Sequence, residues 1–429
     1  MLTRRQTLRA LGAAGIAAPL VSACADRDTG DADGAPGGHS DLRLVKADVL
    51  PSAGDPAAIT GVVDSMGAFT LDLWRELSPG ANLALSPYSI AVALAMTANG
   101  ARGRTAEAMN AVLHVDSLAA YNAGMAALTH RLAALAGPVR ATPDKDEIVL
   151  APANQLFGQA SIVWQQGFLT VLAKMYDAGM RAVDFAEATE AARALVNDWT
   201  AQHTDDRIPE ILPEGALDPS TRLVLIGALY FKAPWSSPFE KAATTPGRFH
   251  RGDGSTVEVE LMSTGEGPTY VSGQHFRGAR LPYAGGTLAM TVALPTGSEA
   301  AALGELLGGG LADHGEPGLR LVMPRWTYRV DTGLKGPLER LGMAVAFGAD
   351  ADFRGMTTQV PLAITDVLHQ TFVAVDEAGT EAAAATAVVM DESAVVTKRQ
   401  LLLDRSFLYV VHDTAHGTPL FVGRVADPS

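Results

Sequence analysis

Side chains that could serve as a nucleophile, a general base or a metal ligand are scattered through this 429-residue chain, which has one cysteine and ten histidines. The sequence contains no G-x-S-x-G nucleophile elbow, no zinc-binding H-E-x-x-H and no Walker loop for phosphate. A single cysteine excludes an intramolecular disulfide and a thiolate cluster around a metal. A triad assembled from distant residues stays open as an alternative, but no residue can be assigned to it. We therefore predict no catalytic residue, no metal site and no cofactor.

The segment Asp376–Val389 is the stretch whose composition suggests a moving part rather than a fixed element. Its four alanines at Ala382–Ala385 favour a helix, whereas the β-branched residues that follow suit a strand. In a strand, Thr380 and Glu381 would lie on opposite faces, and we expect the Glu381 carboxylate on the solvent side. Gly379 would supply the backbone freedom of a hinge. An alanine-rich surface loop or helix is the alternative that these residues alone leave open.

Helical patterns predominate before residue 210, and strand-like runs predominate after it. Apolar residues recur at three- and four-residue spacing from Ile59 to Leu77, which predicts an amphipathic helix that ends at Pro79. The continuous apolar run Leu223–Lys232 is typical of a strand buried on both faces. Other expected helices are Ser89–Asn99, Tyr121–Leu135, Phe168–Tyr176 and Glu187–Thr200, and other expected strands are Val149–Phe157, Thr256–Met262, Phe276–Leu281, Leu288–Leu294, Leu319–Met323, Phe372–Val375, Phe407–His412 and Pro419–Val425. This order predicts an α+β fold with large mixed or antiparallel sheets.

The N-terminal region has the features of an export signal. Residues 1–24 begin with a twin-arginine motif at Arg4 and Arg5 and continue with an apolar stretch too short to span a membrane. They end in Val-Ser-Ala-Cys, which resembles a bacterial lipobox, so we expect lipidation at Cys24, with an unmodified thiol as the alternative. Residues 25–57 are rich in Asp, Gly, Ala and Pro and predict a flexible tether before a folded domain over residues 58–429.

The charge balance limits the partners that the chain could bind. The formal net charge is −14, and phosphate or sulfate contacts need clustered Lys and Arg, so we expect no nucleic-acid binding. The leader predicts that the chain acts outside the cytoplasm, either anchored to the cell membrane by lipid at Cys24 or secreted. We expect it to be a monomer.

Several segments together resemble one known family. Glu377–Ala385 resembles the proximal hinge of serpins, whose inhibitory members carry Glu, Gly, Thr, Glu and a run of small residues in this order. Asn82–Ile90 is similar to an early signature of the family, and Leu403–Tyr409 to its C-terminal signature. Further matches, in the family's order, are Ala93–Met96, Gly100–Thr105, Tyr230–Lys232 with Trp235, Leu341–Met343 with Asp352 and Phe353, His369, and Pro419–Val425. The resemblance covers residues 59–428 and suggests a bacterial lipoprotein-type inhibitory member.

The resemblance implies a serpin fold of about nine helices and three β-sheets with an exposed reactive-centre loop. It implies a protease inhibitor, not an enzyme. A target serine or cysteine protease would cleave the loop and become covalently attached, and the loop would then insert as a new strand of the main sheet, a known case of strand addition. A non-inhibitory binding or carrier protein on the same fold is the alternative.

The resemblance also assigns roles to individual residues. The shutter, which lets the main sheet part, is matched by Ser86, Ser89 and His369, and the breach, where the loop first enters, is matched by Trp235. The sequence departs from the family at Gly227, where the shutter usually has an asparagine. The hinge positions, which share small or short side chains apart from their two glutamates, are Glu377, Gly379, Thr380, Glu381, Ala382, Ala383, Ala384 and Ala385.

The position of the scissile bond depends on the end from which it is counted. Counting from Glu377 gives Ser393–Ala394, whereas counting back from Phe407 gives a position nearer Val395. Both counts put a small or short aliphatic residue in the protease's primary pocket, which predicts an elastase- or subtilisin-like target. Lys398 and Arg399 lie too far along the loop.

Overall fold

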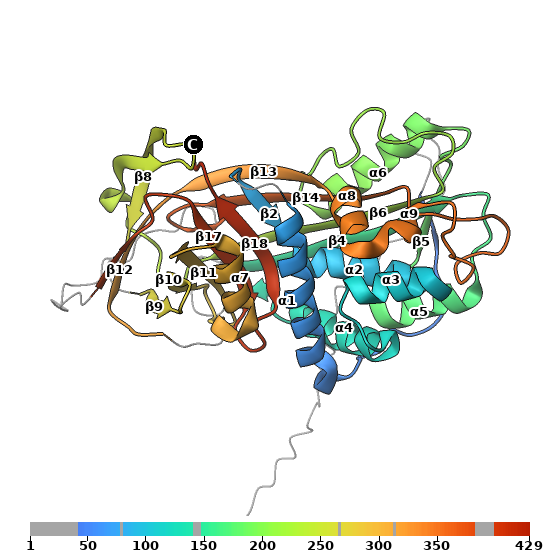
Figure 1. Cartoon of the computed structure of the whole chain (residues 1–429), viewed down its shortest axis with the longest axis horizontal. Helices are drawn as coiled ribbons and strands as arrows, with labels where there is room; N and C mark the ends of the chain where they lie inside the picture. Colours follow the sequence, from blue (N-terminus) through green and yellow to red (C-terminus); the bar gives the residue numbers. More distant parts are fainter. Residues whose placement is uncertain (1–41, 78–79, 140–146, 265–266, 312–314, 382–398) are drawn as a thin grey trace, which may run out of the picture. The chain divides into compact units, whose positions relative to one another are not determined.

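The computed structural model describes residues 42–77, 80–139, 147–264, 267–311, 315–381 and 399–429 (Figure 1). The helix predicted from Ile59 is confirmed as α1 (Ile59–Glu76), which buries Val62, Met66, Phe69 and Leu73 at helical spacing. Helix α2 (Pro87–Ala98) is buried on all sides. It begins after Ser86, whose side chain accepts a hydrogen bond from the Ser89 amide, and Pro87 occupies its first turn.

The remaining helices surround these two. They are α3 (Gly103–Val112), α4 (Leu118–Ala133), α5 (Gln166–Tyr176), α6 (Thr189–His203), α7 (Glu299–Glu305), α8 (Lys335–Leu338) and α9 (Ala344–Phe347), with short 3₁₀ or π turns at Pro56–Ala58, Lys241–Ala243, Leu306–Gly310 and Glu339–Met343. Within the described ranges, none of these helices is both long enough and apolar enough to cross a membrane.

The main sheet has the strand order β1-β5-β4-β6-β15-β14-β13, and β3 pairs with β4. Figure 1 shows its long strands running side by side. Its strands are β1 (Arg43–Val45), β3 (Gly137–Pro138), β4 (Glu147–Gln159), β5 (Met180–Val183), β6 (Leu223–Pro234), β13 (Trp326–Gly333), β14 (Asp366–Val375) and β15 (Gly379–Thr380). The strand predicted at Leu223–Lys232 is confirmed as β6, which is buried along nearly its whole length.

Two smaller sheets complete the fold, so the described residues form three sheets, as expected. The first has the order β2-β18-β17-β11-β10-β9, and the second has the order β16-β12-β8-β7. Their strands are β2 (Leu83–Leu85), β7 (Thr245–His250), β8 (Thr256–Ser263), β9 (Thr269–Ser272), β10 (Phe276–Pro282), β11 (Leu288–Pro295), β12 (Leu319–Pro324), β16 (Arg399–Leu402), β17 (Phe407–Asp413) and β18 (Pro419–Val425).

The main sheet is buried on both faces. Helix α6 lies on one side of β4 and β6, and α2 lies on the other (Figure 1). On the α6 side, Phe157, Val196 and Trp199 belong to a separate apolar cluster, whereas the large core containing α1 and α2 fills the opposite side. Strands β4 and β6 therefore carry apolar residues on both of their faces, as expected for central strands between two layers.

The junction between β6 and β14 is unusual because the two strands pair over only part of their length. They are parallel, and Val224–Ala228 pairs with Asp366–Gln370. Farther along, β15 lies between them and pairs with both. Between these two regions lie Leu229–Lys232 of β6 and Thr371–Ala374 of β14. Among the described residues, no strand pairs with either stretch on the side where β6 and β14 face each other.

The predicted tether over residues 25–57 is wrong for its described part. Arg43–Val45 forms the edge strand β1, paired with β5, and Ala47 is buried. The Ser52 amide donates to the Lys174 carbonyl at 2.7 Å. The open edge of β5 offers unpaired backbone groups that this segment satisfies, and Gly179 allows the approach because a Cβ there would lie 2.7 Å from the Val45 oxygen. Residues 25–41 and the predicted signal with Cys24 lie outside the described residues.

Candidate functional site

The predicted hinge begins inside the main sheet. Gly379 and Thr380 form β15, in which Thr380 lies opposite Val375 of β14 and opposite Ala233 of β6. The start of the predicted hinge is thus already part of the sheet.

The later hinge positions and the scissile bond are not among the residues that the structure describes, which end at Glu381 on this side of the loop and resume at Arg399. The predictions made for them therefore stay predictions. The positions concerned are the hinge alanines Ala382, Ala383, Ala384 and Ala385 and the candidate bond residues Ser393, Ala394 and Val395.

Thr380 is buried in an aromatic pocket at this end of the sheet. It is 4% exposed, and its hydroxyl lies 2.6 Å from the Tyr283 hydroxyl. Burial raises the pKa of Tyr283, so that residue stays a neutral phenol at any ordinary pH. The Tyr283 ring stacks on Trp235 with centroids 4.6 Å apart. A charged side chain at position 380 would be desolvated in this pocket without a partner.

Trp235, the predicted breach residue, holds the hinge backbone directly. Its indole N–H donates to the Asp376 carbonyl at 3.0 Å, and its backbone N–H donates to the Ala378 carbonyl at 2.9 Å. The Asp376 side chain accepts from the amides of Ala378 and Gly379, which fixes the turn between β14 and β15. The structure therefore brings the breach and the start of the hinge into one site.

Glu377 is buried in the same turn, with only 4% of its surface exposed. One of its carboxylate oxygens accepts a hydrogen bond from the Thr244 hydroxyl at 2.7 Å, and its backbone carbonyl accepts from the Phe239 amide at 2.8 Å. These contacts connect the hinge to the segment between β6 and β7.

The surroundings of Gly379 give a steric reason for glycine at this position. Gly379 is absent from the residues with left-handed φ, whereas Glu381 has φ +53°. A Cβ at position 379 would lie 2.3 Å from the Ala233 oxygen and 2.7 Å from the Pro234 Cα. Glycine is needed here because β15 and β6 approach closely, and the left-handed φ is found at Glu381 instead.

Glu381 is also less exposed than expected. Its carboxylate forms an ion pair with the Nε of Arg207, which follows α6 in the chain, and its side chain is only 10% exposed. Burial raises the pKa of Glu381, and the positive charge of Arg207 opposes that rise. The expected solvent-facing carboxylate is thus covered by a guanidinium group. Sequence reasoning missed Arg207, because no local motif links a loop after α6 to the hinge.

The four predicted shutter residues also come together, where β6 meets β14 and α2. Ser86 N–H donates to His369 Nε2 at 2.9 Å, so Nδ1 carries the proton and donates to the Gly227 carbonyl at 2.6 Å. The Ser89 hydroxyl donates to the Ala228 carbonyl at 3.1 Å. Burial lowers the pKa of His369 to about 4, which keeps the imidazole neutral. One histidine therefore connects β14 to β6 and to α2.

The structure explains the missing asparagine at position 227. A Cβ at Gly227 would lie 3.2 Å from the Ser89 oxygen and 3.7 Å from the Ala93 Cβ, so α2 leaves little room for a side chain. An amide occurs one strand away instead: Asn154 of β4 lies opposite Gly227. Its Oδ1 is buried without a partner among the described residues. Sequence reasoning missed Asn154, although an asparagine within the apolar run of β4 was a usable signal.

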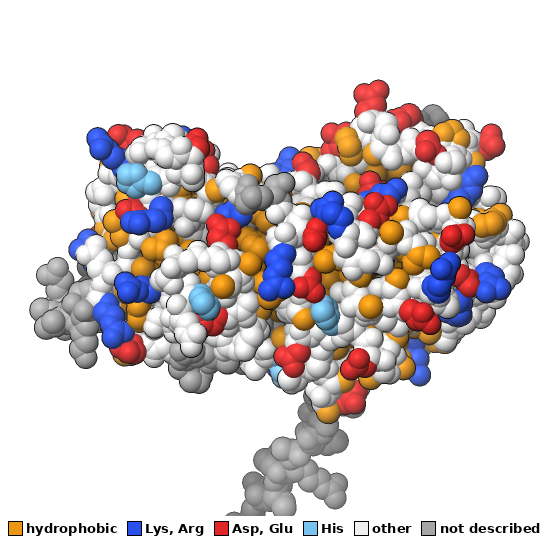
Figure 2. Space-filling view, viewed as in Figure 1, with side chains coloured by type: hydrophobic (Ala, Val, Ile, Leu, Met, Phe, Trp, Pro, Cys, Tyr) orange, Lys and Arg blue, Asp and Glu red, His pale blue; other side chains and the backbone are white. Residues whose placement is uncertain are grey.

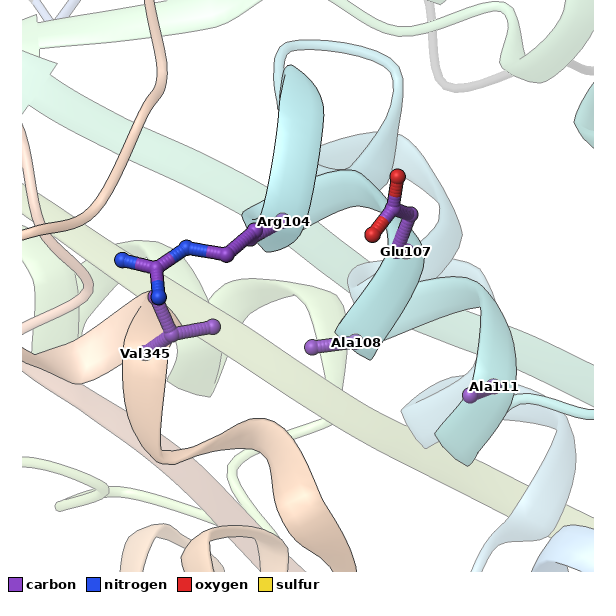
Figure 3. A pocket seen from close by; sticks show the side chains of 5 residues that line it. All are labelled: Arg104, Glu107, Ala108, Ala111 and Val345. Carbon is purple, nitrogen blue, oxygen red and sulfur yellow. The ribbon is translucent and has the colours of Figure 1, made fainter.

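Other surface features of the described chain offer no comparable chemistry. A hollow of about 430 Å³ is lined by Arg104, Glu107, Ala108, Ala111 and Val345, which include no nucleophile beside a base (Figure 3). No group of three or more His, Cys, Asp or Glu side chains within the described ranges is arranged to hold a metal ion. On the face shown in Figure 2, Lys and Arg are interspersed with Asp and Glu.

The neutral state of His369 predicts a pH-dependent stability. The folded protein excludes the proton until about pH 4, whereas the unfolded chain binds it near pH 6.5, so stability decreases as the pH falls from 6.5 towards 4. The loss should reach up to about 3 kcal/mol. It is measured as the melting temperature against pH for the wild type and His369→Gln. His412, whose pKa burial also lowers to about 4, contributes equally to both proteins. Parallel pH curves for the two proteins would contradict this assignment.

The tight space at Gly227 predicts that the family's asparagine is not tolerated. Gly227→Asn should lower stability by about 1–3 kcal/mol, because the side chain must displace α2 near Ser89. Gly227→Ala, the control, should have a smaller effect because it adds one methyl group. The melting temperatures of the wild type and the two variants test this. A higher melting temperature for Gly227→Asn than for the wild type would show that α2 can move to make room for the side chain.

Known proteins are similar to this chain in both sequence and architecture. The family model described as "Serpin (serine protease inhibitor)" matches residues 64–428. The leukocyte elastase inhibitor of Sus scrofa is 33% identical over 377 residues, covering 84% of this chain and 97% of that protein. The plasminogen activator inhibitor 1 of Bos taurus is 34% identical over 401 residues, covering 90% of this chain and 97% of that protein.

Solved structures agree with these relatives. The thermophilic serpin tengpin, in its native state, superposes with a TM-score of 0.77 at 28% identity, covering 89% of this chain and 97% of tengpin. Serpin48 of the insect Tenebrio molitor gives a TM-score of 0.72 at 27% identity, covering 87% of this chain and 99% of that structure. By sequence, by fold and by the residues gathered at the sheet opening, the chain belongs to the serpin family of serine protease inhibitors.

Proposed function

We propose that this chain inhibits serine endopeptidases as a suicide substrate and is not itself an enzyme. The observation that carries the proposal is β15, because the hinge is already paired with both flanking strands of a partly open sheet. The target's catalytic serine attacks the carbonyl carbon of Ser393 in the bond Ser393–Ala394, and the amine of Ala394 leaves with a proton. The acyl-enzyme that remains is carried along when the cleaved loop inserts. A cysteine protease would form the corresponding thioester.

The register of β15 supports full insertion. Thr380 lies opposite Val375 and Ala233, and both pairings are antiparallel. Each further residue therefore advances one step along each strand, and Val389 reaches Asp366, the first residue of β14. The ten residues 380–389 match the ten residues of β14. The segment with small or β-branched side chains thus has the length of the strand beside it.

Insertion also improves the pairing geometry of the sheet. The five directly paired positions of β6 and β14 are parallel, and parallel pairing is somewhat weaker per residue than antiparallel pairing. A strand inserted between them replaces that one parallel interface with two antiparallel ones. It also gives a strand partner to the facing sides of Thr371–Val373 and Leu229–Lys232. The native state is then kinetically trapped, and insertion supplies the free energy that holds the protease.

The shutter fits the same register. Advancing from Thr380 places Thr386 between His369 and Gly227, which are directly paired in the resting sheet. Separation of these strands breaks the bond between His369 Nδ1 and the Gly227 carbonyl. Residues directly opposite one another share a face, so the Thr386 hydroxyl would replace the lost acceptor. The buried histidine then keeps a partner in both states, as a buried polar group requires.

Ser393 at the scissile bond favours proteases with a small primary pocket. We therefore propose an elastase- or subtilisin-like target. The relative named leukocyte elastase inhibitor, which is 33% identical to this chain, supports this class.

Incubation with elastase or subtilisin should give a complex that survives SDS, together with a released C-terminal fragment that begins at Ala394. Thr380→Arg should abolish the complex while cleavage continues, because the guanidinium would be buried in the pocket formed by Tyr283. Thr380→Ser, the matched control, keeps the hydroxyl and should still trap protease. Gel electrophoresis and mass spectrometry of the fragment measure both results. Complete cleavage without any trapped protease, across a broad panel, would favour a non-inhibitory serpin.

We also propose that the chain is a bacterial lipoprotein-type serpin, exported and attached to the cell membrane through Cys24. The support is the twin-arginine start and the Val-Ser-Ala-Cys sequence before residue 25. In a bacterial host, the wild type should incorporate labelled palmitate and partition into detergent, and Cys24→Ser should do neither. Equal labelling of both proteins would refute the lipidation site.

A further inference from the structure

The described chain resumes after the reactive loop at a residue that a trypsin-like protease would recognise. Lys398 and Arg399 are adjacent in the sequence, and Arg399 is the only arginine between Glu381 and Asp404. The primary pocket of a protease sets which side chain it accepts before the scissile bond, and a trypsin-like pocket accepts Lys or Arg. The surroundings of Arg399 therefore decide whether this class of protease can cut the chain here.

The backbone of Arg399 belongs to a strand. Arg399 is the first residue of β16 and lies opposite Leu319 of the parallel strand β12. Leu401 of β16 is only 7% exposed, and Leu403, just after the strand, is fully buried. A serine protease binds the residues on both sides of the scissile bond in an extended cleft, so cleavage after Arg399 requires this end of β16 to leave the sheet. Local opening of this kind is easiest at the end of an element.

The side chain of Arg399 lies against two residues from other strands and loops. Its guanidinium carbon is 4.6 Å from the centre of the Tyr270 ring, and its Nη1 is 2.7 Å from Glu316 Oε2. Tyr270 belongs to β9 and Glu316 precedes β12, and both strands lie at the same end of the molecule (Figure 1). Tyr270 and Glu316 each donate a backbone N–H to the other's carbonyl at 2.8 Å. This pair, called the platform below, is therefore fixed as one unit beside Arg399.

The platform holds the residue of β16 that would otherwise separate first. An ion pair between exposed groups contributes little, and the side chains of Arg399 and Glu316 are 45% and 67% exposed. The ring of Tyr270 adds to it, because a guanidinium over an aromatic face is attracted by the ring quadrupole. Both contacts act on one guanidinium, and both are lost when β16 opens from its first residue. They therefore lower the population of the open form on which proteolysis depends.

We propose that the platform excludes trypsin-like proteases from the basic pair Lys398 and Arg399 and so confines attack to the small residues earlier in the loop. Tyr270 and Glu316 are positioning residues in this role, since they act through Arg399. The inference rests on the proposed function, because it concerns which bond of the same loop a protease cleaves. A cut after Arg399 would let the loop insert without an acyl-enzyme at Ser393, and the inhibitor would be consumed.

The platform is tested with an arginine-specific endoprotease at low concentration, where the cleavage rate follows the population of the open form. Mass spectrometry measures the fragment that begins at Gln400. A peptide of residues 394–405 is the unprotected reference, and the folded wild type should be cleaved at least about a hundredfold more slowly. Tyr270→Leu and Glu316→Gln should each accelerate cleavage about two- to fivefold, and the double variant about tenfold.

Tyr270→Phe is the matched control, because it keeps the aromatic face and should be cleaved at the wild-type rate. Cleavage at the other arginines of each protein controls for general unfolding and should not change. Variants cleaved no faster than the wild type, a wild type cleaved as fast as the peptide, or a trypsin-like protease trapped through Arg399 would overturn the platform. Complexes with elastase or subtilisin are measured for each protein. Their absence throughout contradicts the proposed function, whereas unchanged cleavage rates at Arg399 contradict the platform alone.

Discussion

The fold depends on a main sheet that is only partly closed at its centre. Strands β6 and β14 pair directly at five positions, and β15 separates them at the far end. A sheet buried between two layers normally satisfies every backbone group. Among the described residues, Leu229–Lys232 and Thr371–Val373 have no strand partner on the sides that face each other, so another strand could add pairing there. The described hinge, breach and shutter residues all lie at or beside this junction.

Two kinds of contact control the junction, and they differ in chemistry. At the closed end, neutral His369 binds both Gly227 and Ser86, so it holds β14 to β6 and to α2 with hydrogen bonds alone. At the open end, the hinge is held by packing against Trp235 and Tyr283 and by the ion pair between Arg207 and Glu381. The first set joins β14 to β6 directly, whereas the second holds the hinge from both faces of the sheet.

Much of this arrangement could be predicted from the sequence, because its signals are local. The apolar run of β6, the amphipathic stripe of α1 and the order of family signatures indicated the fold class and the hinge and shutter positions. Strand β13 was missed, although the alternation of Trp326, Tyr328 and Val330 with polar residues is a signal for a half-buried strand. Edge strand β1 was mistaken for a tether, because its pairing partner β5 (Met180–Val183) lies far away in the sequence.

The features that the sequence could not supply are contacts between distant segments. Nothing local indicates that Arg207 reaches Glu381, or that α2 leaves no room for a side chain at Gly227. The sequence suggested flexibility at Gly379, and only the structure shows how closely Ala233 approaches it. The sequence pointed to residues that lie together in the structure, and only three-dimensional packing shows which atoms they contact.

Strand β1 has a mechanical consequence. In the strand order, β1, β5, β4 and β6 lie on one side of the opening, and β14 and β13 lie on the other. Admission of a complete strand must move these two blocks apart by about 4.8 Å, the spacing between neighbouring strands. Strand β1 would move with the first block. Two fluorophores, one beside β1 and one on β13, would measure the change in distance across the sheet. They would report insertion of a complete strand without touching the reactive loop.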